Sequence, residues 1–150
     1  LAKKIANKFP GGIPTLETFI AGFSGLFPDY IFTTIEFNVI PGNREFNRTV
    51  LNKMFSADII HINTAVLVMG HKPQVSHCMS FAYVNIDGKP TPYVLDAQTK
   101  EAITGEKIFD WIDKYKYSRF NILQSRPTVP YGPPLEYNME AFNRMAAAQL

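Results

Sequence analysis

The chain has 150 residues and a formal net charge of +2 at pH 7, and 46% of its residues are hydrophobic while 19% are charged. These values are typical of a globular domain and exclude a disordered chain, and so small a net charge does not support binding to nucleic acid. The single Cys excludes an internal disulfide and any zinc site built from several cysteines.

The length predicts one domain that spans residues 1–150. We expect this domain either to stand alone or to be the ordered or excised part of a longer chain. No membrane span is predicted, because the most apolar stretch, residues 19–32, contains polar interruptions and is shorter than the about 20 residues that cross a bilayer. The first lysines precede no apolar run, so no signal peptide is predicted.

The first part of the chain predicts three helices and one strand. Residues 1–9 place apolar side chains on one helical stripe, and residues 15–27 predict a second helix with Thr15 as its N-cap. Residues 30–40 are β-branched and aromatic, which is typical of a strand. Residues 43–57 have apolar side chains at helical spacing and predict a third helix.

From residue 59 the hydrophobic pattern changes to a period of two, which predicts strands. The predicted strands span residues 59–69, 75–86 and 92–96. A turn is predicted at residues 70–73, and Asp87-Gly88 is a signal for a tight hairpin turn between the second and third of these strands.

Residues 104–115 predict a helix with Trp111 on its core face, and residues 117–123 predict a last strand. Residues 125–134 carry four prolines and predict an extended segment, and residues 136–148 predict a terminal helix. The predicted fold class is therefore α+β: N-terminal helices followed by a mostly antiparallel sheet of four to five strands, with one helix inserted late.

One predicted hairpin carries a His and an Asp that can meet. His77 lies near the start of the 75–86 strand, and Asp96 closes the 92–96 strand. The two ends of an antiparallel hairpin lie side by side, so the imidazole and the carboxylate can come level. A carboxylate beside an imidazole fixes its tautomer and stabilises its charged form. Each residue also fits a structural role, His77 as a partly buried histidine and Asp96 as the cap of a turn.

These residues resemble a known family. His77, the segment of residues 96–99 (Asp-Ala-Gln-Thr) and the following helix with Trp111 look like the C-terminal half of the papain-like thiol enzymes of bacterial toxins and effectors. That group includes papain-fold toxin domains, protein glutamine deamidases and effector cysteine proteases, in which a His is followed by Asp-Pro-Gln or Asp-Pro-Asn. The resemblance covers roughly residues 60–115, with Ala97 in the place of the commoner Pro, and implies a papain-like fold.

The resemblance implies acyl transfer from an amide of a protein substrate, with no cofactor and no metal. His77 would act as general base and acid, Asp96 would orient it, and Gln98 would give secondary polar support. Attack on a Gln side chain would be deamidation, and attack on a peptide bond would be proteolysis. The family also implies a hydrolase that is secreted or delivered into a host or target cell.

The nucleophile is missing from its expected place, because the family has a Cys at a helix N-terminus before the His and no Cys precedes Cys78 here. One explanation is a Cys upstream of the given sequence. A second is a site that has lost its nucleophile. A third is that Cys78 is the nucleophile, which we disfavour because neighbours on a strand point to opposite faces, so that His61 or His71 would have to serve it instead of His77.

Two other readings stay open. The chain can be a non-catalytic domain of the same fold that binds a protein partner through its aromatic surface and its proline-rich tail, or a structural protein with no site. The three histidines do not indicate a metal site, because their spacings of ten and six residues match no recognised zinc pattern.

Overall fold

The computed structural model describes residues 15–128, which form three helices and one six-stranded sheet. In chain order the elements are α2 (Leu16–Leu26), β1 (Tyr30–Asn38), α3 (Arg44–Met54), β2 (Thr64–His71), β3 (Ser76–Ile86), β4 (Lys89–Asp96), β5 (Glu101–Thr104), α4 (Lys107–Tyr115) and β6 (Arg119–Pro127). The predicted α+β class is confirmed. The predicted helices at residues 1–9 and 136–148 lie outside the described residues.

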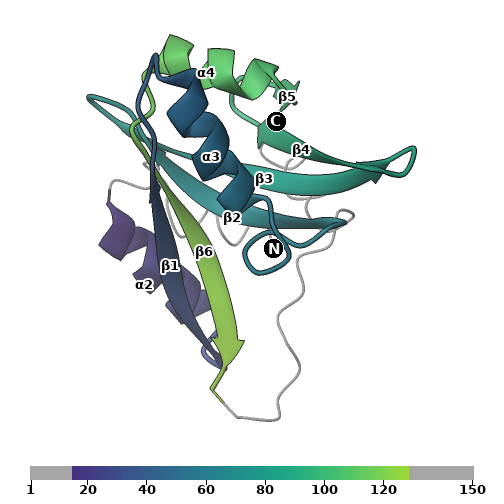
Figure 1. Ribbon diagram of the computed structural model, residues 1–150. Coiled ribbons are helices and arrows are strands. Elements are labelled where there is room, and N and C mark those ends of the chain that lie inside the picture. Colours follow the sequence, from purple (N-terminus) through teal and green to yellow (C-terminus); the bar gives the residue numbers. More distant parts are fainter. Residues whose placement is uncertain (1–14, 129–150) are drawn as a thin grey trace.

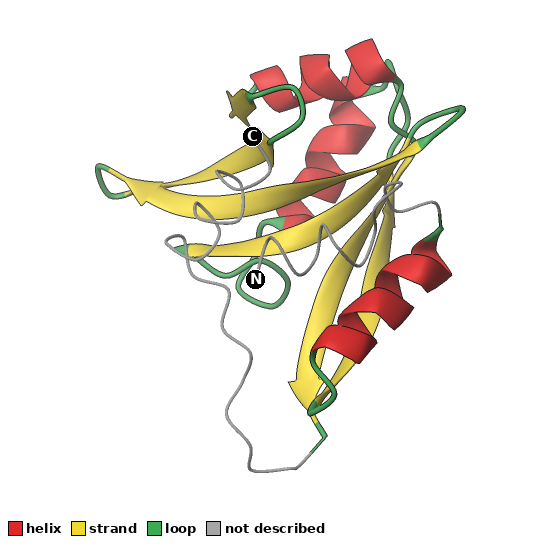
Figure 2. Ribbon diagram, turned by 180° about the vertical axis from the view of Figure 1, so that it is seen from behind, coloured by secondary structure: helices red, strands yellow, loops and turns green. Residues whose placement is uncertain are grey.

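The sheet has the strand order β1-β6-β2-β3-β4-β5, and every neighbouring pair is antiparallel. Helices α3 and α4 cover one face of this sheet (Figure 1). Helix α2 lies on the opposite face, against the part of the sheet that contains β1 and β6 (Figure 2). The last strand, β6, is inserted between the edge strand β1 and β2, so the first and last strands of the described chain pair at one edge of the sheet.

Alternation along β3 separates two apolar cores. Met79 and Phe81 belong to the larger core, which the residues of α3 and α4 complete. Cys78 packs against the smaller core on the other face, around Phe19 and Phe23 of α2. His77 therefore faces α4, and its neighbour Cys78 faces α2.

Several local signals are confirmed. The Thr15 side chain accepts a hydrogen bond from the backbone N–H of Thr18 and is the N-cap of α2. The side chain of Asn43 caps α3 in the same way, although no cap was predicted for this helix. Asp87 and Gly88 have φ values of 51° and 79°, as a two-residue hairpin turn requires, and they join β3 directly to β4.

The prediction of four to five strands was wrong by one strand, β5. This strand has only four residues, Glu-Ala-Ile-Thr, and two of them are poor strand formers, so its pattern was too weak to detect. Because β5 extends to Thr104, the following helix, which was predicted to start at residue 104, starts at Lys107. The strand predicted at residues 30–40 is β1, and it lies between α2 and α3 as the order of the predicted elements requires.

Three strand boundaries also differ from the prediction. Residues 59–63 form turns instead of strand, because the backbone N–H of Ile60 bonds to Met54 O at the end of α3 and that of Thr64 bonds to His61 O. The turn predicted at residues 70–73 comes later, because Gly70 and His71 are the last residues of β2. β6 continues to Pro127, beyond the predicted end at residue 123.

Gly70 stays in the strand because the ring of Tyr117 lies directly over it. A Cβ at this position would be 2.7 Å from Tyr117 Cε1 and 2.6 Å from the Met79 methyl group. Both distances are shorter than side chains tolerate, and the ring, unlike the methionine, is fixed by its neighbours Trp111 and Phe120. The glycine thus allows the α4–β6 connection to pack onto β2.

We expect Gly70→Ala to lower the free energy of unfolding by about 1–3 kcal/mol, the usual cost of overpacking a core. Urea denaturation followed by circular dichroism measures this change. Val75→Ala, at a side chain that is 58% exposed, is the control and should stay within about 0.5 kcal/mol of the unsubstituted protein. Equal stability of Gly70→Ala and the control would contradict this account of the contact.

Candidate active site

The structure brings His77 and Asp96 together. The Nε2 atom of His77, at the start of β3, lies 2.7 Å from Oδ2 of Asp96, at the end of β4. Only 11% of the His77 side chain and 4% of the Asp96 side chain are exposed. The sequence prediction that these two residues meet across the hairpin is confirmed.

The turn after β4 orients Asp96. Its Oδ1 atom accepts hydrogen bonds from the backbone N–H groups of Gln98 and Thr99, at 3.0 and 3.4 Å. This arrangement leaves Oδ2 for His77. Gln98 thus supports the carboxylate through its backbone, whereas its side chain is exposed and makes no hydrogen bond within the described residues.

The Asp96 carboxylate is held in its ionised form. Burial alone would raise the pKa of Asp96, but the hydrogen bond and charge of His77 and the two backbone N–H groups outweigh burial and lower the pKa. An ionised carboxylate only accepts hydrogen bonds, so His77 Nε2 must carry the proton in this pair. In the neutral ring Nδ1 is then the nitrogen that can take a proton from a reacting group.

An aromatic wall closes one side of the pair. Tyr117 lies over Gly70, which is the cross-strand partner of His77. The Tyr117 ring packs 4.4 Å, centroid to centroid, from Trp111 of α4, which is buried as predicted. Burial, together with the nearby negative charge of Asp96, raises the pKa of Tyr117, so its hydroxyl stays neutral. The wall limits the access of water to the pair, which strengthens its electrostatic interaction.

Cys78 does not belong to this site. Its side chain packs into the core beneath α2, on the face of the sheet opposite to His77. Burial raises the pKa of the Cys78 thiol to about 12, so the nucleophilic thiolate form is suppressed at neutral pH. The explanation that Cys78 is the nucleophile is therefore opposed by its position and by its environment.

A second polar cluster, which the sequence reasoning did not identify, lies on the α2 face. His71 Nε2 is 2.6 Å from Asn121 Oδ1, and His71 Nδ1 is 3.0 Å from the hydroxyl of Ser76. Arg119 approaches the same Nδ1 atom at 3.3 Å. Burial and the charge of Arg119 lower the pKa of His71 even though its bond to Asn121 acts in the opposite direction. The only sequence signal was the presence of His71 and Ser76 on either side of a short turn.

His61, the third histidine, is exposed and its side chain makes no hydrogen bond to any described residue. Within residues 15–128 no group of three or more His, Cys, Asp or Glu side chains is arranged to hold a metal ion. None of the three described helices has the length and apolar character needed to cross a membrane. No model of a known protein family matches the sequence, and a search of curated proteins finds no significant match.

The low pKa of Asp96 predicts how the pair affects stability. A carboxyl group whose pKa is lowered by folding stabilises the fold above its unfolded pKa of about 3.9, and this contribution is lost as the pH falls through the lower folded value. We therefore expect the stability difference between the unsubstituted protein and Asp96→Asn to be largest above pH about 5 and to shrink toward pH about 2. Thermal unfolding of both proteins across this pH range measures the stability difference.

Asp58→Asn is the matched control, because Asp58 is exposed and forms no ion pair with a described residue. The difference in stability between Asp58→Asn and the unsubstituted protein should not change with pH. If Asp96→Asn gives the same flat profile, the carboxylate does not form the charge-assisted bond described above.

Cys78 should react slowly in the folded protein. Because its thiol is buried and its pKa is about 12, we expect alkylation by iodoacetamide at pH about 7.5 to be at least about 100-fold slower than in the urea-unfolded chain. Mass spectrometry of samples taken over time measures both rates. A folded-state rate within tenfold of the unfolded one would show that Cys78 is an accessible thiol.

Proposed function

We propose that this chain carries the base–acid half of a papain-like thiol amidohydrolase, a toxin or effector domain that acts on a protein substrate as a glutamine deamidase or a cysteine protease. The observation that carries the proposal is the buried 2.7 Å bond from His77 Nε2 to the ionised Asp96. The bond orients the ring and leaves Nδ1 for a reacting thiol, as general acid–base catalysis requires.

The reaction has two steps. A thiol first gives its proton to His77 Nδ1, and the thiolate attacks the amide carbon of the substrate. His77 then passes that proton to the leaving nitrogen, which departs as ammonia from a Gln side chain or as an amine from a peptide bond. In the second step His77 takes a proton from water, which attacks the thioester and releases the acid. The proton returns to the departing thiolate.

Asp96 contributes in both steps. When His77 holds the extra proton, the imidazolium lies against a carboxylate that two backbone N–H groups keep in place. This arrangement stabilises the charged ring while holding its tautomer, and an amide at the same position could do only the second. The resemblance of residues 60–115 to the papain-like toxins supports the same assignment of roles.

The thiol is proposed to belong to a segment that precedes these 150 residues in a longer polypeptide. Within the given sequence the single Cys is Cys78, which faces away from His77. The same observation favours a second candidate function, a domain of this fold that binds a protein partner and has lost its nucleophile. The two functions differ in whether a thiol approaches Nδ1.

Thiol reactivity in the native polypeptide separates them without knowledge of the substrate. An activated Cys beside His77 should be alkylated by iodoacetamide at pH about 6, where ordinary thiols react slowly. His77→Gln should slow the labelling of that Cys by at least about tenfold, because the imidazole no longer takes its proton. Peptide mapping by mass spectrometry identifies the labelled residue, and Cys78 serves as the slow internal reference.

His61→Gln is the matched control, because His61 is exposed and lies outside the pair. Labelling should be unchanged in this variant. If every Cys of the native polypeptide is labelled at pH about 6 as slowly as it is in the His77→Gln variant, the thiol-enzyme function is rejected. The interaction domain is then favoured. Where a reactive Cys is found, release of ammonia or of new amino termini from the substrate distinguishes deamidation from proteolysis.

A further inference from the structure

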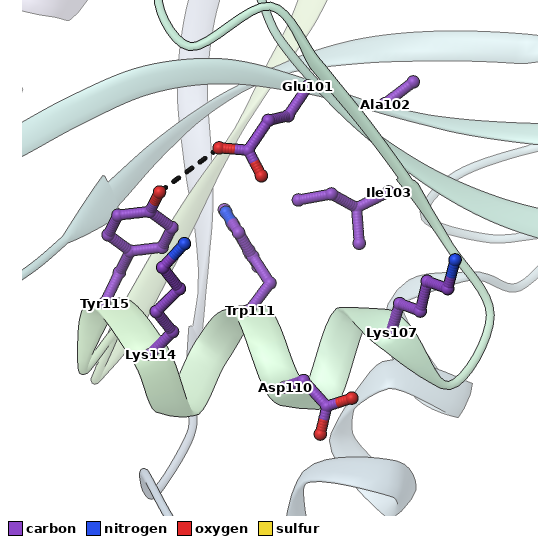
Figure 3. A pocket seen from close by; sticks show the side chains of 8 residues that line it. All are labelled: Glu101, Ala102, Ile103, Lys107, Asp110, Trp111, Lys114 and Tyr115. Carbon is purple, nitrogen blue, oxygen red and sulfur yellow. Dashed lines mark hydrogen bonds between the residues drawn. The ribbon is translucent and has the colours of Figure 1, made fainter.

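A pocket lies beside the His77–Asp96 pair, between α4 and β5. Its volume is about 490 Å³, which is enough for a side chain. Figure 3 shows the apolar side chains of Trp111 and Ile103 turned into the space between the helix and the strand. Lys107 and Lys114 rise from α4 on either side of Trp111 (Figure 3). The pocket therefore has an apolar floor and a cationic rim.

The pocket is connected to the pair through β5 and Tyr115. Glu101, which lines the pocket, is the direct cross-strand partner of Asp96. The hydroxyl of Tyr115 donates a hydrogen bond to Glu101 Oε1 at 3.2 Å (Figure 3), and its ring packs against Tyr117 of the aromatic wall. A substrate segment that leaves His77 along this wall would reach the pocket next.

The acidic and the basic side chains that line the pocket differ in whether an ion partner offsets their charge. Asp110 forms an ion pair with Arg44 at 3.0 Å, whereas Glu101 accepts a hydrogen bond from the neutral hydroxyl of Tyr115, which does not offset its charge. By contrast, Lys107 and Lys114 form no ion pair or hydrogen bond with any residue in the range 15–128. Two lysines thus face one carboxylate whose charge has no ion partner, and the net charge that remains at the pocket is positive.

Tyr115 also holds cations close to the pocket. Lys114 Nζ lies 5.2 Å from the centroid of the Tyr115 ring, and Lys72 Nζ lies 5.5 Å from the same centroid. Lys72 follows β2 in the loop that leads to His77, so it brings a third positive charge toward the pair. Cation–π contacts of this kind restrict where the ammonium groups can lie.

We propose that this pocket, the α4–β5 pocket, binds a carboxylate of the substrate and so selects amides that have an acidic group a few residues away. The inference deepens the proposed function and rests on it for the position of the reacting amide. Lys107 and Lys114 are the residues that recognise the anion, and Trp111 and Ile103 contact the aliphatic part of the side chain.

The geometry of the sheet sets the spacing. The pocket lies between α4 and β5, and β5 is two strands from β3. Strands are about 4.8 Å apart, so the path from His77 is about 10–14 Å. An extended chain covers about 3.3 Å per residue, which places the carboxylate three or four residues from the reacting amide. The carboxylate can come from a Glu or Asp side chain or from the C-terminus of the substrate.

Intrinsic fluorescence gives a direct test, because Trp111 is the single Trp of the chain and lines the pocket. The probes are three N-acetylated heptapeptides: Ac-EAAQAAE-NH2, its neutral counterpart Ac-QAAQAAQ-NH2, and Ac-QAAQAAQ-OH, which has only a terminal carboxylate. Each is titrated to about 10 mM. We expect the first to change the emission saturably and to bind at least about tenfold more tightly than the neutral peptide, with weaker binding at higher salt.

Charge-matched variants identify the residues. The double variant Lys107→Gln/Lys114→Gln should lower the affinity for the acidic peptide at least tenfold. Lys53→Gln/Lys89→Gln removes the same charge from exposed positions on α3 and β4 and should leave the affinity unchanged. All four lysines are exposed, so neither variant is expected to unfold the protein, and thermal unfolding checks this.

The outcomes separate the sources of the carboxylate. Preference for Ac-EAAQAAE-NH2 supports an acidic side chain, and preference for Ac-QAAQAAQ-OH supports a chain terminus. Equal affinity for all three peptides, no saturable change, or equal loss in both double variants overturns the inference.

A further peptide keeps the test independent of catalysis. Ac-EAAAAAE-NH2 has no glutamine, so its binding shows that the pocket recognises anions whether or not a reactive thiol is found. Amide hydrolysis that shows no preference for acidic substrates would leave the proposed function intact and reject the pocket.

Discussion

The two-residue period of β3 is the constraint on which the rest of the structure depends. Because successive side chains point to opposite faces, His77 shares a face with Met79 and α4, whereas Cys78 shares a face with α2. A shift of one residue in the pairing of β3 with β4 would turn His77 away from Asp96. The burial of Met79 and Phe81 against α4 holds this register and with it the orientation of the histidine.

The buried carboxylate of Asp96 is tolerable because both of its oxygen atoms have hydrogen-bond partners. Asp96 receives one hydrogen bond from His77 and two from the turn that follows β4. Charged groups that are buried without such partners cost several kcal/mol or shift their pKa until they become neutral. Here the pKa of Asp96 is lowered in spite of burial, which shows that its partners outweigh the loss of water.

The two buried histidine clusters have different chemistry. His77 is hydrogen-bonded to a carboxylate, which fixes its tautomer and leaves Nδ1 for a proton from a reacting group. His71 faces an amide and a guanidinium, and its pKa is lowered by burial and by the charge of Arg119. A ring that resists protonation and ties the ends of β2, β3 and β6 together is suited to a structural role. This contrast is why the proposed chemistry is assigned to His77.

The sequence by itself determined the α+β class, helix α2 with its Thr15 cap, helix α3, the Asp87-Gly88 hairpin and the meeting of His77 with Asp96. All of these follow from signals local in the chain: hydrophobic period, capping residues and turn residues. Only the tertiary structure decided the place of β6 between β1 and β2, the existence of β5 and the pocket beside it. Those features depend on contacts between residues far apart in sequence, such as the Tyr117 ring over Gly70, and no local pattern records which distant side chain will fill a given space.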